Sequence, residues 1–119
     1  IIPLFKSLPD SEPTPITDPI ATRFWITLDQ ATDFVWDTMN LPPDAFGGKV
    51  HIPRLKSVRV MDVADAIRPG KPIKIIGLRP GDKLHETLSI DGERYESQKN
   101  DFISIDEIRD HAEGELALR

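Results

Sequence analysis

The spacing of apolar residues predicts a long helix over residues 27–40 of the chain. Apolar side chains recur there about every three or four positions, so we expect one face of this helix to be buried. Thr27 and Gln30 match the S/T-x-x-E/Q pattern of a capping box, which places the start of the helix just after Thr27. Pro42 and Pro43 follow closely and end the helix.

Two shorter helices are predicted at residues 1–8 and 61–68, and a proline directly follows each of them. In the second of these helices, Val63 and Ala64 fall on the side that should face the core. Near the other end of the chain, Asp106 is expected to cap a polar terminal helix.

Clusters of β-branched and aromatic residues between turn signals predict several short strands. Residues 89–97 are expected to form a hairpin that turns at Asp91-Gly92, and residues 79–88 a turn and a short helix. Because short strands alternate with helices, the expected fold class is mixed α/β (α+β). No G-x-G-x-x-G sequence occurs, so we expect no complete Rossmann domain and no cofactor site in this chain. The expected strands are residues 16–17, 23–27, 49–53, 57–60, 72–78 and 102–105.

Composition and charge restrict the function classes. With 119 residues, 39% of them hydrophobic and 29% charged, the chain has the make-up of one globular domain. A net charge of -5 opposes broad attraction to nucleic acid or to an anionic membrane, so any phosphate binding must be local. The absence of cysteine excludes disulfides and thiolate metal sites.

The beginning of the chain bears on its location and origin. No apolar run reaches the ~20 residues of a membrane span, and no basic-then-apolar leader occurs, so we expect a cytoplasmic protein. The chain has no initiating Met and begins within the apolar stretch Ile1–Phe5. We therefore expect it to be a portion of something larger.

The octapeptide Arg79-Pro80-Gly81-Asp82-Lys83-Leu84-His85-Glu86, here called the 79–86 segment, gathers charged residues around a turn. The Arg79 guanidinium can make a bidentate contact to a phosphate, and Lys83 adds positive charge. Glu86 is a suitable acceptor for two neighbouring hydroxyls such as those of a ribose. Turn and capping statistics taken alone favour a plainer interpretation, an exposed turn with Asp82 as a helix N-cap.

Arg23 is a second candidate for phosphate binding, because bulky neighbours would limit the rotamers of its side chain. The alternative is a surface arginine stacked on Phe24 or Trp25. The three histidines show no metal-ligand spacing, and no serine or threonine lies in a nucleophile elbow. We therefore expect neither a metal site nor a catalytic residue in this chain.

Several of these motifs occur together in an order that resembles the C-terminal half of bacterial UDP-N-acetylglucosamine 4,6-dehydratases. These enzymes are extended short-chain dehydrogenases/reductases of surface-polysaccharide synthesis. The resemblance covers residues 1–90, which would form a UDP-sugar-binding lobe, and leaves residues 91–119 as a hairpin, a strand and a polar tail. It departs from the family pattern at Asp82, where Glu is usual, and at Ala21, where Met is common. The motifs are Ile16-Thr17-Asp18-Pro19, Thr22-Arg23-Phe24, Gly47-Gly48, Val60-x-Asp62-Val63-Ala64 and the 79–86 segment.

The resemblance implies that Arg23 and Arg79 hold the diphosphate of a UDP-sugar, with Lys83 beside them. It also implies that Glu86 lies near the uridine and that Phe5 belongs to the segment entering the uracil pocket. In the complete enzyme, NADP and the catalytic acid and Tyr-x-x-x-Lys set belong to an N-terminal Rossmann half. This chain alone would then bind substrate without acting as a lyase.

Two alternatives remain open. One is a non-catalytic interaction or oligomerisation module derived from the same lobe, because apolar residues that would abut the Rossmann half need another partner, such as a second copy. The other is part of a nucleotide-sugar epimerase of the same superfamily. The expected partners are thus a UDP-sugar together with either the missing Rossmann half or a homo-oligomer.

Overall fold

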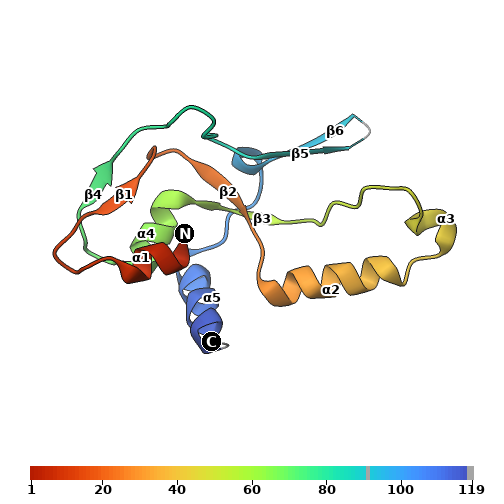
Figure 1. Ribbon diagram of the computed structural model, residues 1–119, viewed down its shortest axis with the longest axis horizontal. Coiled ribbons are helices and arrows are strands. Elements are labelled where there is room, and N and C mark those ends of the chain that lie inside the picture. The colour runs from red at the N-terminus through yellow and green to blue at the C-terminus, as the bar shows by residue number, and fades with distance from the viewer. Residues whose placement is uncertain (91, 118–119) are drawn as a thin grey trace.

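Short strands pair two by two in this computed structural model, which describes residues 1–90 and 92–117 (Figure 1). Strand β1 (Thr14–Ile16) pairs in parallel with β4 (Ile73–Ile75), and Thr14 lies opposite Ile73. Strand β2 (Thr22–Trp25) pairs antiparallel with β3 (Lys56–Arg59), and Arg23 lies opposite Val58. The mixed α/β class predicted from the alternating pattern is therefore confirmed.

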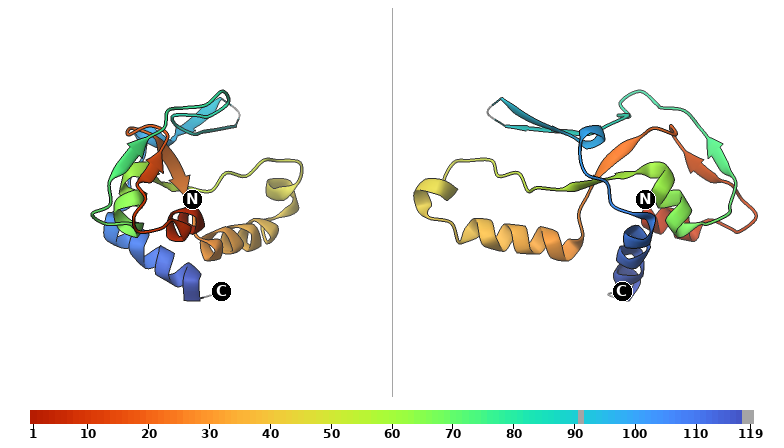
Figure 2. Two further views of the ribbon diagram at one scale, coloured as in Figure 1. Left: turned by 60° about the vertical axis from the view of Figure 1, so that its left-hand side comes forward. Right: turned by 180° about the vertical axis from the view of Figure 1, so that it is seen from behind.

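The predicted hairpin is present as β5 (Thr87–Ile90) and β6 (Glu93–Glu96), which pair antiparallel. Gly92 has φ +83°, a left-handed conformation that glycine adopts at little cost, whereas Asp91 lies outside the described residues. A short 3₁₀ helix, η1 (Ser97–Lys99), follows the hairpin directly. The hairpin projects from the rest of the molecule in Figures 1 and 2.

Three helices and the first two strand pairs surround the core (Figures 1 and 2). They are α1 (Ile2–Ser7), α4 (Val60–Ile67) and α5 (Ile105–Ala117). Helix α5 lies against α4 and contributes Ile108 and Ala112 to the core, so residues from beyond position 91 share the core of the first 90. The buried apolar residues are Ile2, Phe5, Ile16, Ala21, Val58, Val60, Val63, Ala64, Ala66, Ile103, Ile108 and Ala112.

Helix α2 (Leu28–Met39) has the predicted capping box but not the predicted burial. The Gln30 amide donates to the Thr27 Oγ1, and the Gln30 side chain accepts from the Thr27 amide. None of its twelve residues is buried, and Leu28 and Trp36 are 68% and 66% exposed. With α3 (Pro43–Phe46) it forms an arm that extends from the core (Figure 1). Helical spacing shows that a face is apolar, but it does not supply the surface that covers it.

Four other predicted elements differ from the structure. Residues 49–53 have no ladder partner and run as irregular chain, and residues 102–105 contribute a single bridge between Phe102 and Ser57. No helix follows the 79–86 segment, which leads through a turn directly into β5. Helix α5 begins one residue before Asp106, because the Ser104 Oγ accepts from the Glu107 amide in the way an N-cap does.

The helices of the described chain are all too short or too polar to cross a bilayer.

Candidate functional site

Arg23 joins β2 to the 79–86 segment. One terminal nitrogen of its guanidinium donates to the Thr22 carbonyl at 2.6 Å and to the Leu84 carbonyl at 3.1 Å. The other donates to the Lys83 carbonyl at 2.6 Å. The Thr22 amide donates to the Leu84 carbonyl at 3.0 Å, so backbone and side chain fasten the same two segments. Three backbone acceptors thus fix the orientation of the guanidinium group, and none of the three carries a formal charge.

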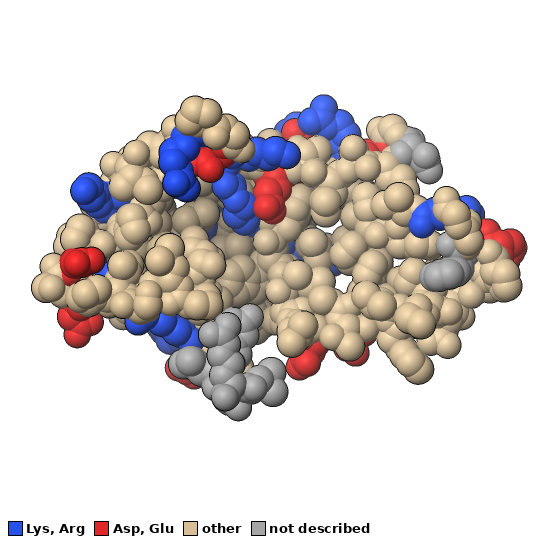
Figure 3. Space-filling view, viewed as in Figure 1, with Lys and Arg blue, Asp and Glu red and all other residues tan. Residues whose placement is uncertain are grey.

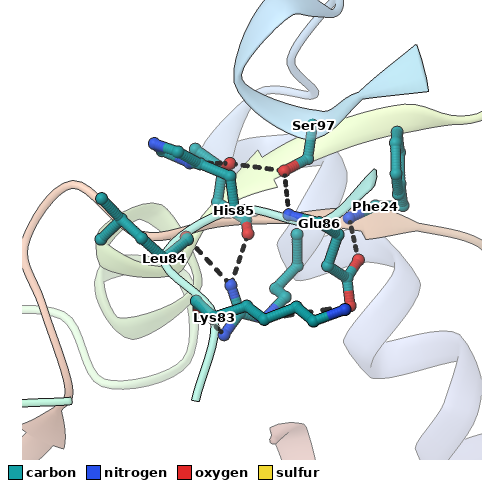
Figure 4. Close-up of polar contacts among 8 residues, drawn as sticks. Phe24, Lys83, Leu84, His85, Glu86 and Ser97 are labelled. Carbon is teal, nitrogen blue, oxygen red and sulfur yellow. Dashed lines mark hydrogen bonds and ion pairs between the residues drawn. The ribbon is translucent and has the colours of Figure 1, made fainter. Parts of the chain in front are cut away.

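Glu86 lies beside the Arg23 guanidinium and also binds the amide of Phe24, a contact drawn in Figure 4. Its Oε2 accepts from the Phe24 amide at 2.8 Å, and its Oε1 lies 3.9 Å from the Arg23 Nε. Both side chains are partly exposed, at 32% for Arg23 and 43% for Glu86, so solvent screens the pair. The Glu86 Oε1 retains acceptor capacity toward a ligand hydroxyl.

Arg79 and Asp82 form the turn of the 79–86 segment. The Arg79 amide donates to the Asp82 Oδ2 at 2.9 Å, and the Asp82 amide donates back to the Arg79 carbonyl at 2.9 Å. Gly81 has φ +90°, which this turn requires and which only glycine adopts readily. Asp82 thus closes its own turn, which explains why the predicted helix N-terminus is absent.

The electrostatics of the turn place both arginines near one carboxylate. The Arg79 amide hydrogen bond is the main cause that lowers the pKa of Asp82; desolvation opposes it, and the charges of Arg79 and Arg23 lower the pKa further. The Arg79 side chain is 79% exposed, and its Nε lies 3.5 Å from the Asp82 Oδ2. Lys83 is also exposed. Figure 3 shows basic and acidic side chains gathered over this part of the molecule.

An apolar cavity of about 210 Å³ adjoins Arg23. A guanidinium beside apolar walls suits a ligand that has both a ring and an anionic group. Phe5 does not line this cavity; its ring is 2% exposed within the core, and its predicted contact with a ligand stays a prediction. The lining residues are Ile1, Arg23, Phe24, Trp25, Ile26, Val58, Val60 and Val63.

Three polar side chains that the sequence analysis did not select meet behind the 79–86 segment. The Thr22 Oγ1 lies 2.6 Å from the His85 Nδ1 and 2.6 Å from the Ser97 Oγ. The Ser97 Oγ accepts from the Glu86 amide at 2.9 Å (Figure 4). Thr22 and Ser97 lie 75 positions apart in the chain, so no local sequence signal could have paired them.

Tyr95 and Lys99 have the Tyr-x-x-x-Lys spacing, which the sequence analysis also overlooked. Tyr95 lies on strand β6 and Lys99 in η1, and each is bound to a carboxylate. The Tyr95 hydroxyl donates to Glu93 at 2.9 Å, which raises the pKa of the phenol, and the Lys99 Nζ lies 2.8 Å from a Glu96 oxygen. A phenol with a raised pKa is a poor general base, so this pair lacks the electrostatics of a catalytic set.

The described residues contain no group of three His, Asp or Glu side chains arranged to hold a metal ion. His111, which lies on α5, instead accepts a hydrogen bond at its Nδ1 from the Trp25 Nε1 at 2.8 Å. The two rings are stacked, with an interplanar angle of 13°. His111 therefore packs α5 against the end of β2.

Comparisons with known proteins place this chain among polysaccharide-biosynthesis proteins. Residues 1–107 match the family described as polysaccharide biosynthesis protein. The chain is 39% identical over 90 residues to the inverting UDP-N-acetylglucosamine 4,6-dehydratase of Campylobacter jejuni subsp. jejuni serotype O:2, covering 74% of this chain and 26% of the relative. It is 32% identical over 127 residues to the capsular polysaccharide biosynthesis protein CapD of Staphylococcus aureus, covering 99% and 21%.

A solved structure has the same fold. The X-ray structure of Pen from Bacillus thuringiensis matches with a TM-score of 0.79 at 22% sequence identity, covering all of this chain and 46% of that one. This chain thus spans about a quarter or less of the length of the Campylobacter jejuni dehydratase and of CapD.

Proposed function

We propose that this chain, which belongs to the polysaccharide biosynthesis protein family because its residues 1–107 match the model of that family, binds the diphosphate of a UDP-sugar. In this proposal the chain is part of a UDP-N-acetylglucosamine 4,6-dehydratase. The observation that carries the proposal is the position of Arg23, held by the Lys83 and Leu84 carbonyls beside Glu86 and the Arg79 turn. Two arginines near one turn provide the two positive charges that a diphosphate needs.

In this proposal each site residue has its own role. Arg23 is fixed by backbone carbonyls, so it can present its remaining N–H groups to one phosphate with little loss of side-chain entropy. Arg79 is exposed and joins the second phosphate when the ligand arrives, with Lys83 adding to the field. The Glu86 Oε1, which faces the Arg23 Nε and retains acceptor capacity, accepts from a ribose hydroxyl, and the apolar cavity beside Arg23 takes the base.

The complete enzyme would be a lyase that oxidises C4 of the sugar, eliminates water across C5 and C6, and returns hydride to C6. NADP would supply that hydride chemistry from a part of the enzyme outside this chain. No glycine-rich turn joins a strand to a helix within residues 1–90 and 92–117, so this chain's residues do not fit a dinucleotide. Arg23 and Arg79 would therefore contribute substrate binding and no chemical step. An epimerase of the same superfamily would share this binding, and the product of the complete enzyme distinguishes the two.

Calorimetric titration with UDP-N-acetylglucosamine tests the proposal. We expect the chain to bind, and Arg79→Ala to weaken binding by about 1.5 to 3 kcal/mol, the loss typical of a charge-assisted contact. Arg94→Ala is the matched control, because Arg94 is also an exposed arginine 3.7 Å from a carboxylate, and it should bind as the wild type does. Equal losses in the two variants would reduce the effect to net charge and contradict the role of Arg79.

The exposed apolar face of α2 favours a second candidate, an interaction or oligomerisation module. Leu28, Val35, Trp36 and Met39 are all more than half exposed and recur at helical spacing along one helix. An exposed stripe of this kind commonly marks a protein contact. Light scattering decides between the candidates: a stable oligomer that lacks affinity for UDP-sugar supports the module, and Trp36→Glu should then dissociate it.

A further inference from the structure

Glu86, Ser97, Thr22 and His85 form a chain of hydrogen bonds, and the available protons determine which group donates in each bond. Ser97 is 0% exposed and Thr22 is 4% exposed, so bulk water has almost no access to the two hydroxyls. Each contact in this group therefore depends on a proton that the protein itself supplies.

The Glu86 amide can only donate, so the Ser97 Oγ accepts from it and keeps its own proton for the Thr22 Oγ1. Thr22 then donates its single proton to the His85 Nδ1, which must be unprotonated. If the Nδ1 carried the proton, it would donate to the Thr22 Oγ1 while the Glu86 amide still donated to Ser97, and one of the two buried hydroxyl protons would have no acceptor within this network. The arrangement therefore selects the His85 tautomer whose Nδ1 accepts and whose proton lies on Nε2.

We propose that Ser97 and Thr22 are positioning residues for the contact of Arg23 with an anionic ligand, an inference that rests on the proposed diphosphate-binding function. Two of the three carbonyls that hold the Arg23 guanidinium belong to Lys83 and Leu84. The next two residues along the chain are His85 and Glu86, whose ring and amide are the two ends of the hydroxyl network. Loss of a hydroxyl releases residues 85–86, shifts the two carbonyls and misdirects Arg23.

The network also ties the hairpin to this site. The Ser97 amide donates to the Glu86 carbonyl at 2.9 Å, and the Ser97 Oγ receives the Glu86 amide, so Ser97 binds both backbone groups of one residue. Glu86 in turn binds the Phe24 amide beside Arg23 through its carboxylate. The base of the β5–β6 hairpin and the arginine are thus connected through a single residue.

Thr22→Val is the first test, because valine keeps the shape of threonine and removes its hydroxyl. Titration of the whole chain with UDP should show Kd raised about five- to tenfold, less than the loss of a whole charge-assisted contact, because Arg23 stays present and is only misdirected. Thr22→Ser restores a hydroxyl and should recover most of the affinity. Nitrogen-15 NMR of His85 provides a second readout: the proton should reside on Nε2 in the wild type, and Thr22→Val should yield a mixture of tautomers.

Ser97→Ala is the second variant and remains informative should Thr22→Val fail to fold in a thermal melt. Its matched control is Ser89→Ala, which makes the same change at an exposed serine of the same hairpin and should leave UDP affinity unchanged. Wild-type affinity in folded Thr22→Val and Ser97→Ala would overturn the positioning role while leaving the proposed function intact. A wild-type His85 with its proton on Nδ1 would overturn the direction of the network. Failure of the wild-type chain to bind UDP would instead reject the proposed function and this inference with it.

Discussion

Asp82 accepts a hydrogen bond from the Arg79 amide and lies within electrostatic reach of two guanidinium groups. Its position shows how a residue expected to cap a helix serves a turn instead. The carboxylate takes the amide three residues before it, and that contact, rather than either arginine charge, is the main cause of its lowered pKa. At the residue scale, the site is therefore organised by side chains that bind backbone groups.

The lowered pKa of Asp82 gives the turn a pH dependence. A carboxyl group with a folded-state pKa below its ordinary value of 3.8 stabilises the fold above that value, and this contribution disappears as the pH falls through the folded-state pKa. NMR titration of the Asp82 carboxyl carbon should thus show a midpoint below 3.8. Arg79→Ala should retain most of this shift, because it keeps the backbone amide. A full return to the ordinary value in Arg79→Ala would contradict the hydrogen-bond explanation.

The Tyr95 phenol shows the opposite shift, because the Glu93 carboxylate opposes ionisation beside it. We expect Glu93→Gln to lower the pKa of Tyr95 toward its ordinary value of 10.0, as followed by ultraviolet absorbance. Glu96→Gln is the control, because Glu96 is a neighbouring carboxylate that contacts Lys99 and Gln98 in the described residues and not the phenol. This variant should leave the pKa of Tyr95 nearly unchanged. An unchanged pKa of Tyr95 in Glu93→Gln would show that another group sets it.

At the scale of the elements, helices α2 and α5 differ in how much of each is buried. Both are amphipathic helices of similar length, of twelve and thirteen residues. Helix α5 buries Ile108 and Ala112 against α4, whereas α2 buries none of its residues. Isolated helices of about this length are marginal in water, so the Thr27 capping box contributes a large share of the stability of α2.

This difference predicts unequal costs for truncating large apolar side chains. Ile108→Ala should lower the free energy of unfolding by about 2 to 5 kcal/mol, because Ile108 is 0% exposed in the core. Trp36→Ala should cost less than about 0.5 kcal/mol in the monomeric chain, because its ring is 66% exposed. Urea denaturation at low protein concentration measures both. A large loss for Trp36→Ala would mean that the ring is covered in solution.

The whole molecule is elongated rather than spherical, with principal extents of 55 × 34 × 23 Å. The arm of α2 and α3 and the β5–β6 hairpin both extend away from the core in Figure 2. The apolar residues that remain exposed are distributed over several elements, including Leu4 on α1, Val50 beyond α3 and Ile75 on β4. Surfaces of this kind are consistent with a chain that spans only part of the length of its relatives.

The radius of gyration provides the prediction at this scale. The Cα radius of gyration is 16.6 Å, whereas a compact domain of this length would have one of about 13 to 14 Å. Small-angle X-ray scattering of the monomer should therefore give a value near the larger figure. A value near the smaller figure would mean that the arm folds back onto the core and covers the α2 face.

The sequence by itself determined most of the local structure. The capping box at Thr27 and Gln30, the prolines that end α1 and α4, and the hairpin strands are set by interactions between near neighbours, which a linear pattern records. The resemblance carried by the 79–86 segment and Thr22-Arg23-Phe24 also indicated the family correctly. The binding roles given to Arg23, Arg79, Lys83, Glu86 and Phe5 stay predictions.

Only the tertiary structure decided which side chains meet and which faces are covered. Arg23 binds the Lys83 and Leu84 carbonyls some 60 positions away, and Ser97 binds Thr22 across 75. The apolar pattern of α2 could not show that its face stays open, because burial depends on what packs opposite. The 79–86 segment is the exception, because its turn is formed by a contact between near neighbours, the Arg79 amide and the Asp82 carboxylate. Hydrogen bonds and packing between distant residues depend on where the chain folds back, and short-range patterns carry no record of that.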